Sequence, residues 1–146
     1  MNFVPENPDY ERDVRSIAVA QPFMTLIGGT IERVAPGEVE LRLPFRDDLA
    51  QHSGVLHAGV TTTLADNACG CAAATLPPKG SLPLTTEFKI NLVAPAVGEA
   101  IVARGRVVSA GKRMQTCAAD VFAQQGGEER LVATMLASMF RAESSP

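Results

Sequence analysis

Asp66 is the only side chain between Asp48 and Lys79 that carries a full charge at neutral pH. Its neighbours in the sequence are Ala, Thr, Gly, Cys and Leu, and an ionised carboxylate among such residues is costly unless it is paired or used in chemistry. A carboxylate in this setting can act as a general base or as a nucleophile toward an activated carbonyl group. A purely structural alternative is a hydrogen bond to Thr62 or Thr63, one helical turn earlier.

Two glycines, Gly54 and Gly59, bracket His57 at the expected start of a helix. The first backbone N–H groups of a helix have no partner within it, and the helix dipole favours negative charge at this end. Such an N-terminus can stabilise an oxyanion, and together with Asp66 it is the minimum equipment for hydrolysing an activated carbonyl compound. His57 could instead serve only as a turn or helix-cap residue.

The segment from about His57 to Thr75 is expected to form one long helix. It contains no proline, it is rich in alanine, and the prolines at 77 and 78 end it. The segment lacks a polar face of the usual kind, so we expect the helix to be buried nearly all round. Small side chains along it allow neighbouring backbone to come close: Gly59, Ala65, Ala68, Gly70 and Ala72.

Strand character is found twice before this helix and four times after it, at residues 30–34, 38–45, 84–93, 100–109, 114–124 and 130–141. In the second stretch Val39, Leu41 and Leu43 alternate with charged residues, which is typical of a half-buried strand. In the third stretch the same alternation predicts one common face for Leu84, Thr86, Phe88, Ile90 and Leu92.

This order of elements predicts an α+β fold in one domain, residues 1–146, with a helical segment within residues 1–22 and a flexible tail at 142–146. An antiparallel sheet of five or six strands would curl around the long helix and bury it. So small a sheet leaves an open edge strand and a half-apolar face, and both favour a symmetric dimer.

Composition places the chain among soluble globular proteins, since 46% of its residues are apolar and 20% are charged. The net charge of −3 gives no general attraction to nucleic acid. The start of the chain does not read as a signal peptide and no apolar run is long enough for a membrane span, so we expect a cytoplasmic protein without a membrane partner. The three cysteines, at 69, 71 and 117, are expected to be buried and inert, with no disulfide and no metal site.

Several motifs resemble those of hotdog-fold acyl-CoA thioesterases of the phenylacetate-degradation type. They are residues 54–59 (GVLHAG), 63–67 (TLADN), 85–91 (TTEFKIN) and 109–113 (SAGKR), together with Pro95, and the likeness extends over about residues 23–141. The resemblance implies a hotdog fold, in which a curved antiparallel sheet wraps a long central helix. It also implies the hydrolysis of acyl-CoA thioesters.

The resemblance assigns the central chemistry to Asp66, as general base or nucleophile toward the thioester. The backbone N–H of Ala58 or Gly59 would polarise the carbonyl at the helix start. The family usually has His-Gly-Gly where this chain has His57-Ala58-Gly59, and a backbone N–H survives that change.

Three further residues receive supporting roles from the resemblance. Gln51, which stands where the family often has Asn, or His57 would help to position the carbonyl, and Thr85 would hold the attacking water, although it could also be an ordinary strand residue. His57 and Asp66 are nine residues apart, which on a straight helix is about half a turn out of phase. They cannot both face one site in one subunit, so the resemblance implies a site shared across a dimer interface.

The basic turn at Ser109, Gly111, Lys112 and Arg113 would bind the CoA phosphates, with a merely solvated turn as the alternative. Coenzyme A would be part of the substrate, and no separate cofactor is implied.

We therefore expect a homodimer, or a homotetramer of two dimers, that hydrolyses small or medium acyl-CoA thioesters, aromatic ones included, to free acid and CoA. One alternative is a non-hydrolytic acyl-CoA-binding or acyl-carrier partner protein. Another is a hotdog dehydratase or hydratase for acyl thioesters, which would need an acid–base pair placed together for proton transfer.

Overall fold

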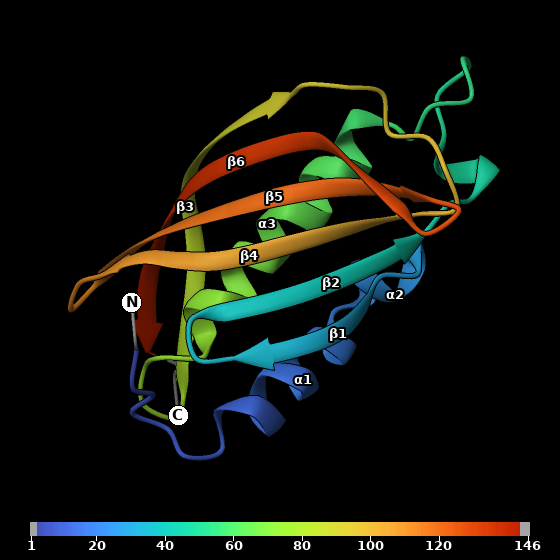
Figure 1. Cartoon of the computed structure of the whole chain (residues 1–146). Coiled ribbons are helices and arrows are strands. Elements are labelled where there is room, and N and C mark those ends of the chain that lie inside the picture. Colours follow the sequence, from blue (N-terminus) through green and yellow to red (C-terminus); the bar gives the residue numbers. More distant parts are fainter. Residues whose placement is uncertain (1–2, 144–146) are drawn as a thin grey trace.

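The computed structural model describes residues 3–143 of the chain. Helices α1 (Tyr10–Ala20) and α2 (Pro22–Ile27) precede strands β1 (Thr30–Ala35) and β2 (Glu38–Pro44) and a short 3-10 turn at Asp47–Leu49. The long helix α3 (Ala58–Ala74) is followed by β3 (Ser81–Leu92), β4 (Ala100–Ala110), β5 (Met114–Gln125) and β6 (Glu128–Glu143). The six strands form one antiparallel sheet in the order β1-β2-β4-β5-β6-β3, so the expected α+β hotdog architecture is confirmed (Figure 1).

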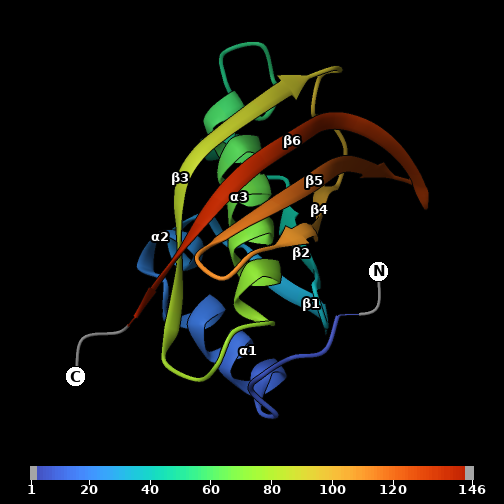
Figure 2. The ribbon, with the colours of Figure 1, turned by 90° about the vertical axis from the view of Figure 1, so that its left-hand side faces the viewer.

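The sheet curves around α3 and covers one side of it along its length (Figures 1 and 2). Fully buried helix side chains such as Leu64, Ala65 and Ala72 pack into the core beneath the strands. Gly105 of β4 lies directly over α3, where a Cβ would collide with the backbone of Ala68. Glycine at 105 therefore lets the strand approach the helix closely at Ala68, the close approach that was expected of the small helix residues. At Gly70 no such approach occurs, because a Cβ built there would meet no atom within 4 Å.

The N-terminal segment forms two helices rather than one. Pro22 occupies the first position of α2, and its missing N–H and fixed φ suit a helix start but cannot continue α1. Gln21, between the two helices, is extended with φ −82° and ψ 109°. α1 packs against β1 and α3, with Val14 buried, and α2 ends at Gly28 in the left-handed region.

The prediction that Leu84 and Phe88 share a face of β3 is wrong, because a β-bulge interrupts the strand between Thr85 and Glu87. Leu84 pairs with Phe140, whereas Thr85 and Phe88 pair with Met139 and Ala137, which are both buried. Directly paired residues point to the same face of a sheet. The extra residue of the bulge therefore turns both Thr85 and Phe88 toward the helix side.

One face of α3 is left half-open, so the expectation of a helix buried nearly all round is wrong for the single chain. Thr62, Thr63, Asp66 and Asn67 on this face are all half-buried. β3 pairs only with β6, and it forms one edge of the sheet. Four large apolar side chains of β3 are each at least 41% exposed, although such residues are usually buried: Leu82, Leu84, Phe88 and Leu92.

The cysteines at 69, 71 and 117 are buried and free of disulfides, as expected. Burial raises the pKa of Cys71 and of Cys117 to about 12 and raises the pKa of Cys69 as well, so these thiols stay protonated and unreactive near neutral pH. Of the tail expected at 142–146, residues 142 and 143 belong to β6, and residues 144–146 lie outside the described residues. Within residues 3–143 no helix has both the length and the apolar character needed to cross a membrane.

Candidate active site

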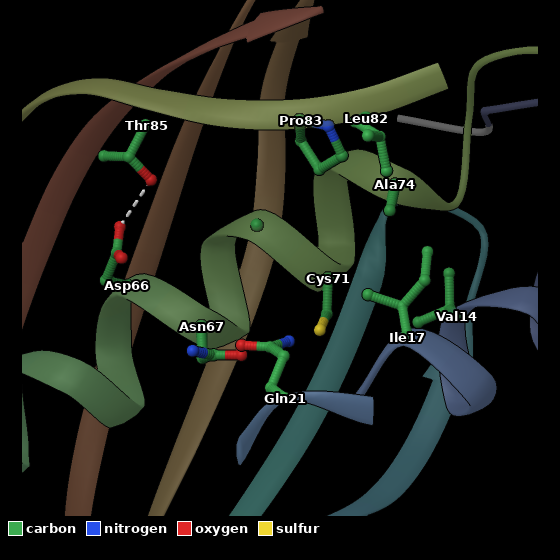
Figure 3. Close-up of a pocket in the computed structure, with 11 residues that line it drawn as sticks. Val14, Ile17, Gln21, Asp66, Asn67, Cys71, Ala74, Leu82, Pro83 and Thr85 are labelled. Carbon is green, nitrogen blue, oxygen red and sulfur yellow. Dashed lines mark hydrogen bonds between the residues drawn. The ribbon is translucent and has the colours of Figure 1, made fainter. Parts of the chain in front are cut away.

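Asp66 and Thr85 are brought together from the middle of α3 and the start of β3 (Figure 3). The Thr85 hydroxyl donates a hydrogen bond of 2.8 Å to Asp66 Oδ1 and also lies 3.3 Å from the Met139 sulfur. Asp66 is half-buried rather than buried, since its face of α3 is the one that the chain leaves open. The carboxylate is therefore oriented by a hydroxyl and still accessible to a substrate and to water.

Asp66 and Thr85 line a groove, here called the Asp66 groove, between α1, α3 and β3 with a volume of about 220 Å³. One stripe of α3 contributes Asp66, Asn67, Gly70, Cys71 and Ala74. Two polar side chains in the lining, Gln21 and Asn67, were not expected from the sequence. Gly70 follows Asp66 by four residues, so the periodicity of α3 alone would have placed it beside Asp66. Asn67 follows by one residue, a spacing that does not place two side chains on one helix face, and only the pocket lining assigns it to this groove.

At the start of α3, His57 is the N-cap residue, with extended backbone angles of φ −60° and ψ 138°. Its Nδ1 accepts a hydrogen bond of 2.9 Å from the backbone N–H of Gly59. The helix-cap role, left open by the sequence, is therefore present in the structure. The Gly59 N–H is occupied by this bond, whereas the Ala58 N–H has no acceptor among the residues that the structure describes. Of the two candidate oxyanion donors, Ala58 is the free one.

Gln51 lies beside this helix start. It lines a second groove, here called the Gln51 groove, together with His57 and Ala58, and the groove has a volume of about 440 Å³. The opposite wall is apolar and comes from the end of β3 and the following loop, including Leu92 and Pro95. The loop carrying Gln51 is closed by two hydrogen bonds, from Gln51 N to the Val55 carbonyl and from Gly54 N to the Gln51 carbonyl.

The Asp66 groove and the Gln51 groove share no lining residue. His57, at the N-cap of α3, and Asp66 are nine positions apart in the sequence, about 13 Å along the helix axis. The single chain thus presents two half-sites, one with the carboxylate and one with the free backbone donor.

The basic turn connects β4 to β5 at the end of the sheet away from the Gln51 loop (Figure 1). Gly111 N donates a 2.8 Å hydrogen bond to the Met114 carbonyl, and Lys112 and Arg113 are both exposed. Ser109, also exposed, follows a register shift in the pairing of β4 with β5. The turn therefore offers exposed cationic side chains without engaging either groove in the same chain.

The model of the thioesterase superfamily matches residues 53–130, which include the helix start, Asp66 and Thr85. The chain belongs to the thioesterase superfamily. This confirms the family expected from the motifs and the expected enzyme class, a thioester hydrolase.

Individual relatives of this thioesterase agree with the family model. Human acyl-coenzyme A thioesterase 13 is 27% identical over 110 residues, which are 74% of this chain and 78% of the relative. The crystal structure of a thioesterase family protein from Silicibacter pomeroyi superposes with a TM-score of 0.90 at 39% identity, covering 92% of this chain and 99% of that one. The E. coli PaaI protein of the phenylacetic acid degradation operon shares the fold, with a TM-score of 0.83 at 16% identity, covering 94% of this chain and 96% of PaaI.

Proposed function

We propose that the protein hydrolyses small or medium acyl-CoA thioesters, aromatic acyl groups included, at a site shared between two copies of the chain. The observation that carries the proposal is the split between the oriented carboxylate of Asp66 and the unoccupied N–H of Ala58, which lie in different grooves of one chain. Hydrolysis needs both the Asp66 carboxylate and the Ala58 N–H. In a symmetric dimer the carboxylate of each copy can lie beside the Ala58 N–H of the other copy, which gives two equivalent sites.

The surface around β3 supports a second copy as the missing partner. β3 is an edge strand, and unpaired strand edges commonly join a second chain. Beyond the bulge the helix-facing residues Phe88 and Leu92 are 45% and 51% exposed. This apolar face of β3 is therefore not fully covered by residues of the same chain. Two copies joined along this edge would bury both apolar faces, and two such dimers could form a tetramer.

In the proposed reaction Asp66 takes a proton from a water molecule as the water oxygen bonds to the thioester carbon. The Thr85 hydroxyl donates a hydrogen bond to Asp66 Oδ1, so the lone pairs of its oxygen remain free to accept a hydrogen bond from that water. The N–H of Ala58 from the other copy stabilises the negative charge that forms on the carbonyl oxygen. The C–S bond then breaks, and the proton held by Asp66 passes to the departing CoA sulfur.

The alternative in which Asp66 attacks the carbon directly gives an enzyme-bound anhydride and CoA thiolate, and water then hydrolyses the anhydride. Gln51 and His57 would position the carbonyl in either case, because both line the groove that contains Ala58. Lys112 and Arg113 would bind the CoA phosphates, with Ser109 and Gly111 shaping the turn.

Thiol release from a panel of acyl-CoAs tests the proposed function. We expect turnover that varies with chain length and with aromatic character. Binding without thiol release would favour the acyl-CoA-binding alternative, and hydration of an enoyl-CoA would favour the hydratase. Sedimentation at the assay concentration should show a dimer or larger species, and an active monomer would contradict the shared site.

A further inference from the structure

Gln21 and Asn67 are two amide side chains that line the Asp66 groove and make no hydrogen bond within residues 3–143. Both are half-buried, and they come from different elements: Gln21 from the junction of α1 and α2, Asn67 from α3. Figure 3 shows their side chains directed toward one another, on the side of the groove away from Thr85. Amide groups that are partly withdrawn from water gain from a ligand that hydrogen-bonds to them.

The remainder of the groove is apolar and lined by small residues on the helix side. Gly70 and Ala74 of α3 face Val14, Ile17 and Leu82 across it. A Cβ built at Gly70 meets no atom within 4 Å, so the space over this residue is open. The volume of about 220 Å³ exceeds the volume of about 150 Å³ at which an apolar protein cavity binds benzene. An acyl group of about six carbons, or a phenyl ring with a short linker, fits this space.

The position of Asn67 limits where a polar group on the acyl chain could be bound. Asn67 directly follows Asp66, and consecutive Cα atoms are about 3.8 Å apart. The Asn67 amide therefore reaches atoms only a few bonds from the carbon attacked at Asp66. An amide can both donate and accept, which matches a hydroxyl or oxo group. A carboxylate substituent would be repelled by Asp66, the only acidic side chain in the groove lining.

Resting on the function proposed above, we infer that the acyl group lies in the Asp66 groove and that Gln21 and Asn67 select acyl groups with a neutral hydroxyl or oxo substituent on the second or third carbon. The apolar end of the chain extends past Gly70 toward Ala74. Gln21 and Asn67 determine specificity by hydrogen-bonding to the substituent. They do not take part in the reaction at the carbonyl, which is the role of Asp66 and Thr85.

The test compares matched substrate pairs: 3-hydroxyhexanoyl-CoA with hexanoyl-CoA, and 3-hydroxy-3-phenylpropionyl-CoA with 3-phenylpropionyl-CoA. We expect kcat/KM of the native enzyme to favour the hydroxylated member of each pair by about tenfold or more, as for a partly exposed site that hydrogen-bonds a substrate hydroxyl. In the double variant Gln21→Leu, Asn67→Leu this ratio should fall to about one. Gln125→Leu, an exposed glutamine on the β5–β6 hairpin, is the matched control and should keep the native ratio.

A second variant tests the location of the acyl group without removing an amide. Gly70→Val projects a side chain into the groove from a helical position with open space. It should lower kcat/KM for hexanoyl-CoA at least tenfold more than for acetyl-CoA, whose acyl group is too short to reach residue 70. The inference would be overturned if Gly70→Val lowered kcat/KM equally for hexanoyl-CoA and acetyl-CoA. It would also be overturned if the native enzyme had the same kcat/KM for the hydroxylated and the plain member of each pair. In both cases the protein would still be a thioesterase. Failure to hydrolyse any acyl-CoA would instead remove the proposed function itself.

Discussion

The Thr85 hydroxyl is hydrogen-bonded to Asp66 Oδ1 at 2.8 Å, and this bond joins the edge strand β3 to the middle of α3. The contact depends on the bulge between Thr85 and Glu87, which keeps Thr85 on the helix side while Phe88 also faces inward. Bulges that redirect a side chain often lie next to active sites. One backbone irregularity thus positions a candidate catalytic pair and leaves an apolar edge open beside it.

Replacing Thr85 with Val removes the hydroxyl and keeps the shape of the side chain. We expect kcat to fall by about tenfold, because Asp66 loses an orienting hydrogen bond and the water loses an acceptor. The control is Thr86→Val, since the Thr86 hydroxyl donates a hydrogen bond to the Ser138 carbonyl of β6 and not to Asp66. Equal losses in the two variants would indicate a strand effect and not a role in the site.

The basic turn is tested by changing Lys112 and Arg113 to Ala together. If they hold CoA phosphates, KM should rise about tenfold with little change in kcat, the pattern of uniform substrate binding. The defect should shrink for a pantetheine thioester that lacks the nucleotide. Lys79→Ala, at another exposed loop, should leave KM close to its native value. An equal defect with both substrates would show that the turn acts in another way.

The outer face of the sheet gives a prediction about stability and pH. Hydrogen bonds from Arg104 and, to a smaller extent, from Gln124 hold the pKa of Glu129 below its usual range. A carboxylate with a lowered folded-state pKa stabilises the fold above its unfolded-state pKa of about 4.3, and this contribution is lost as the pH falls through the folded-state value.

Glu129→Gln should therefore lower the free energy of unfolding by up to about 1 kcal/mol at pH 7, the usual upper range for a partly exposed ion pair. The difference from the native protein should disappear in acid, below the folded-state pKa. Denaturant unfolding of both proteins at neutral and acid pH measures it. A difference that stays constant with pH would mean that the ion pair is not its source.

The sequence was sufficient to predict the arrangement of elements, because the alternation in β2 and the proline-free, alanine-rich run of α3 depend on local patterns. The face of β3 could not be predicted, since a bulge moves one residue out of the alternation without a marked change in composition. Gln21 was missed as a groove residue because its place depends on how α1 packs against α3. The cap function of His57 and the occupation of the Gly59 N–H depend on side-chain geometry that residue types leave open.

Asp66→Asn removes the base and keeps the size of the side chain, and the amide oxygen can still accept the bond from Thr85. We expect kcat to fall by about 10² or more, while the protein stays folded and its thermal midpoint is equal to the native value or higher. Near-native turnover in a folded variant would make Asp66 structural.

The shared site is tested most directly by mixing two inactive chains. Ala58 is the first residue of α3, where proline is well tolerated, so Ala58→Pro deletes the N–H and keeps the helix. We expect kcat of this variant to fall by about 10² to 10³, the usual cost of one oxyanion donor.

Co-expression of Ala58→Pro with Asp66→Asn under two affinity tags isolates the mixed dimer. One of its two sites would then combine an intact Asp66 from one chain with an intact Ala58 from the other. The measurement is the activity of this mixed dimer beside each homodimer. A shared site predicts recovery to about half of the native activity, because a symmetric dimer has two equivalent sites and one is restored. Activity no higher than that of the inactive homodimers would place Asp66 and Ala58 in the same chain's site and contradict this account.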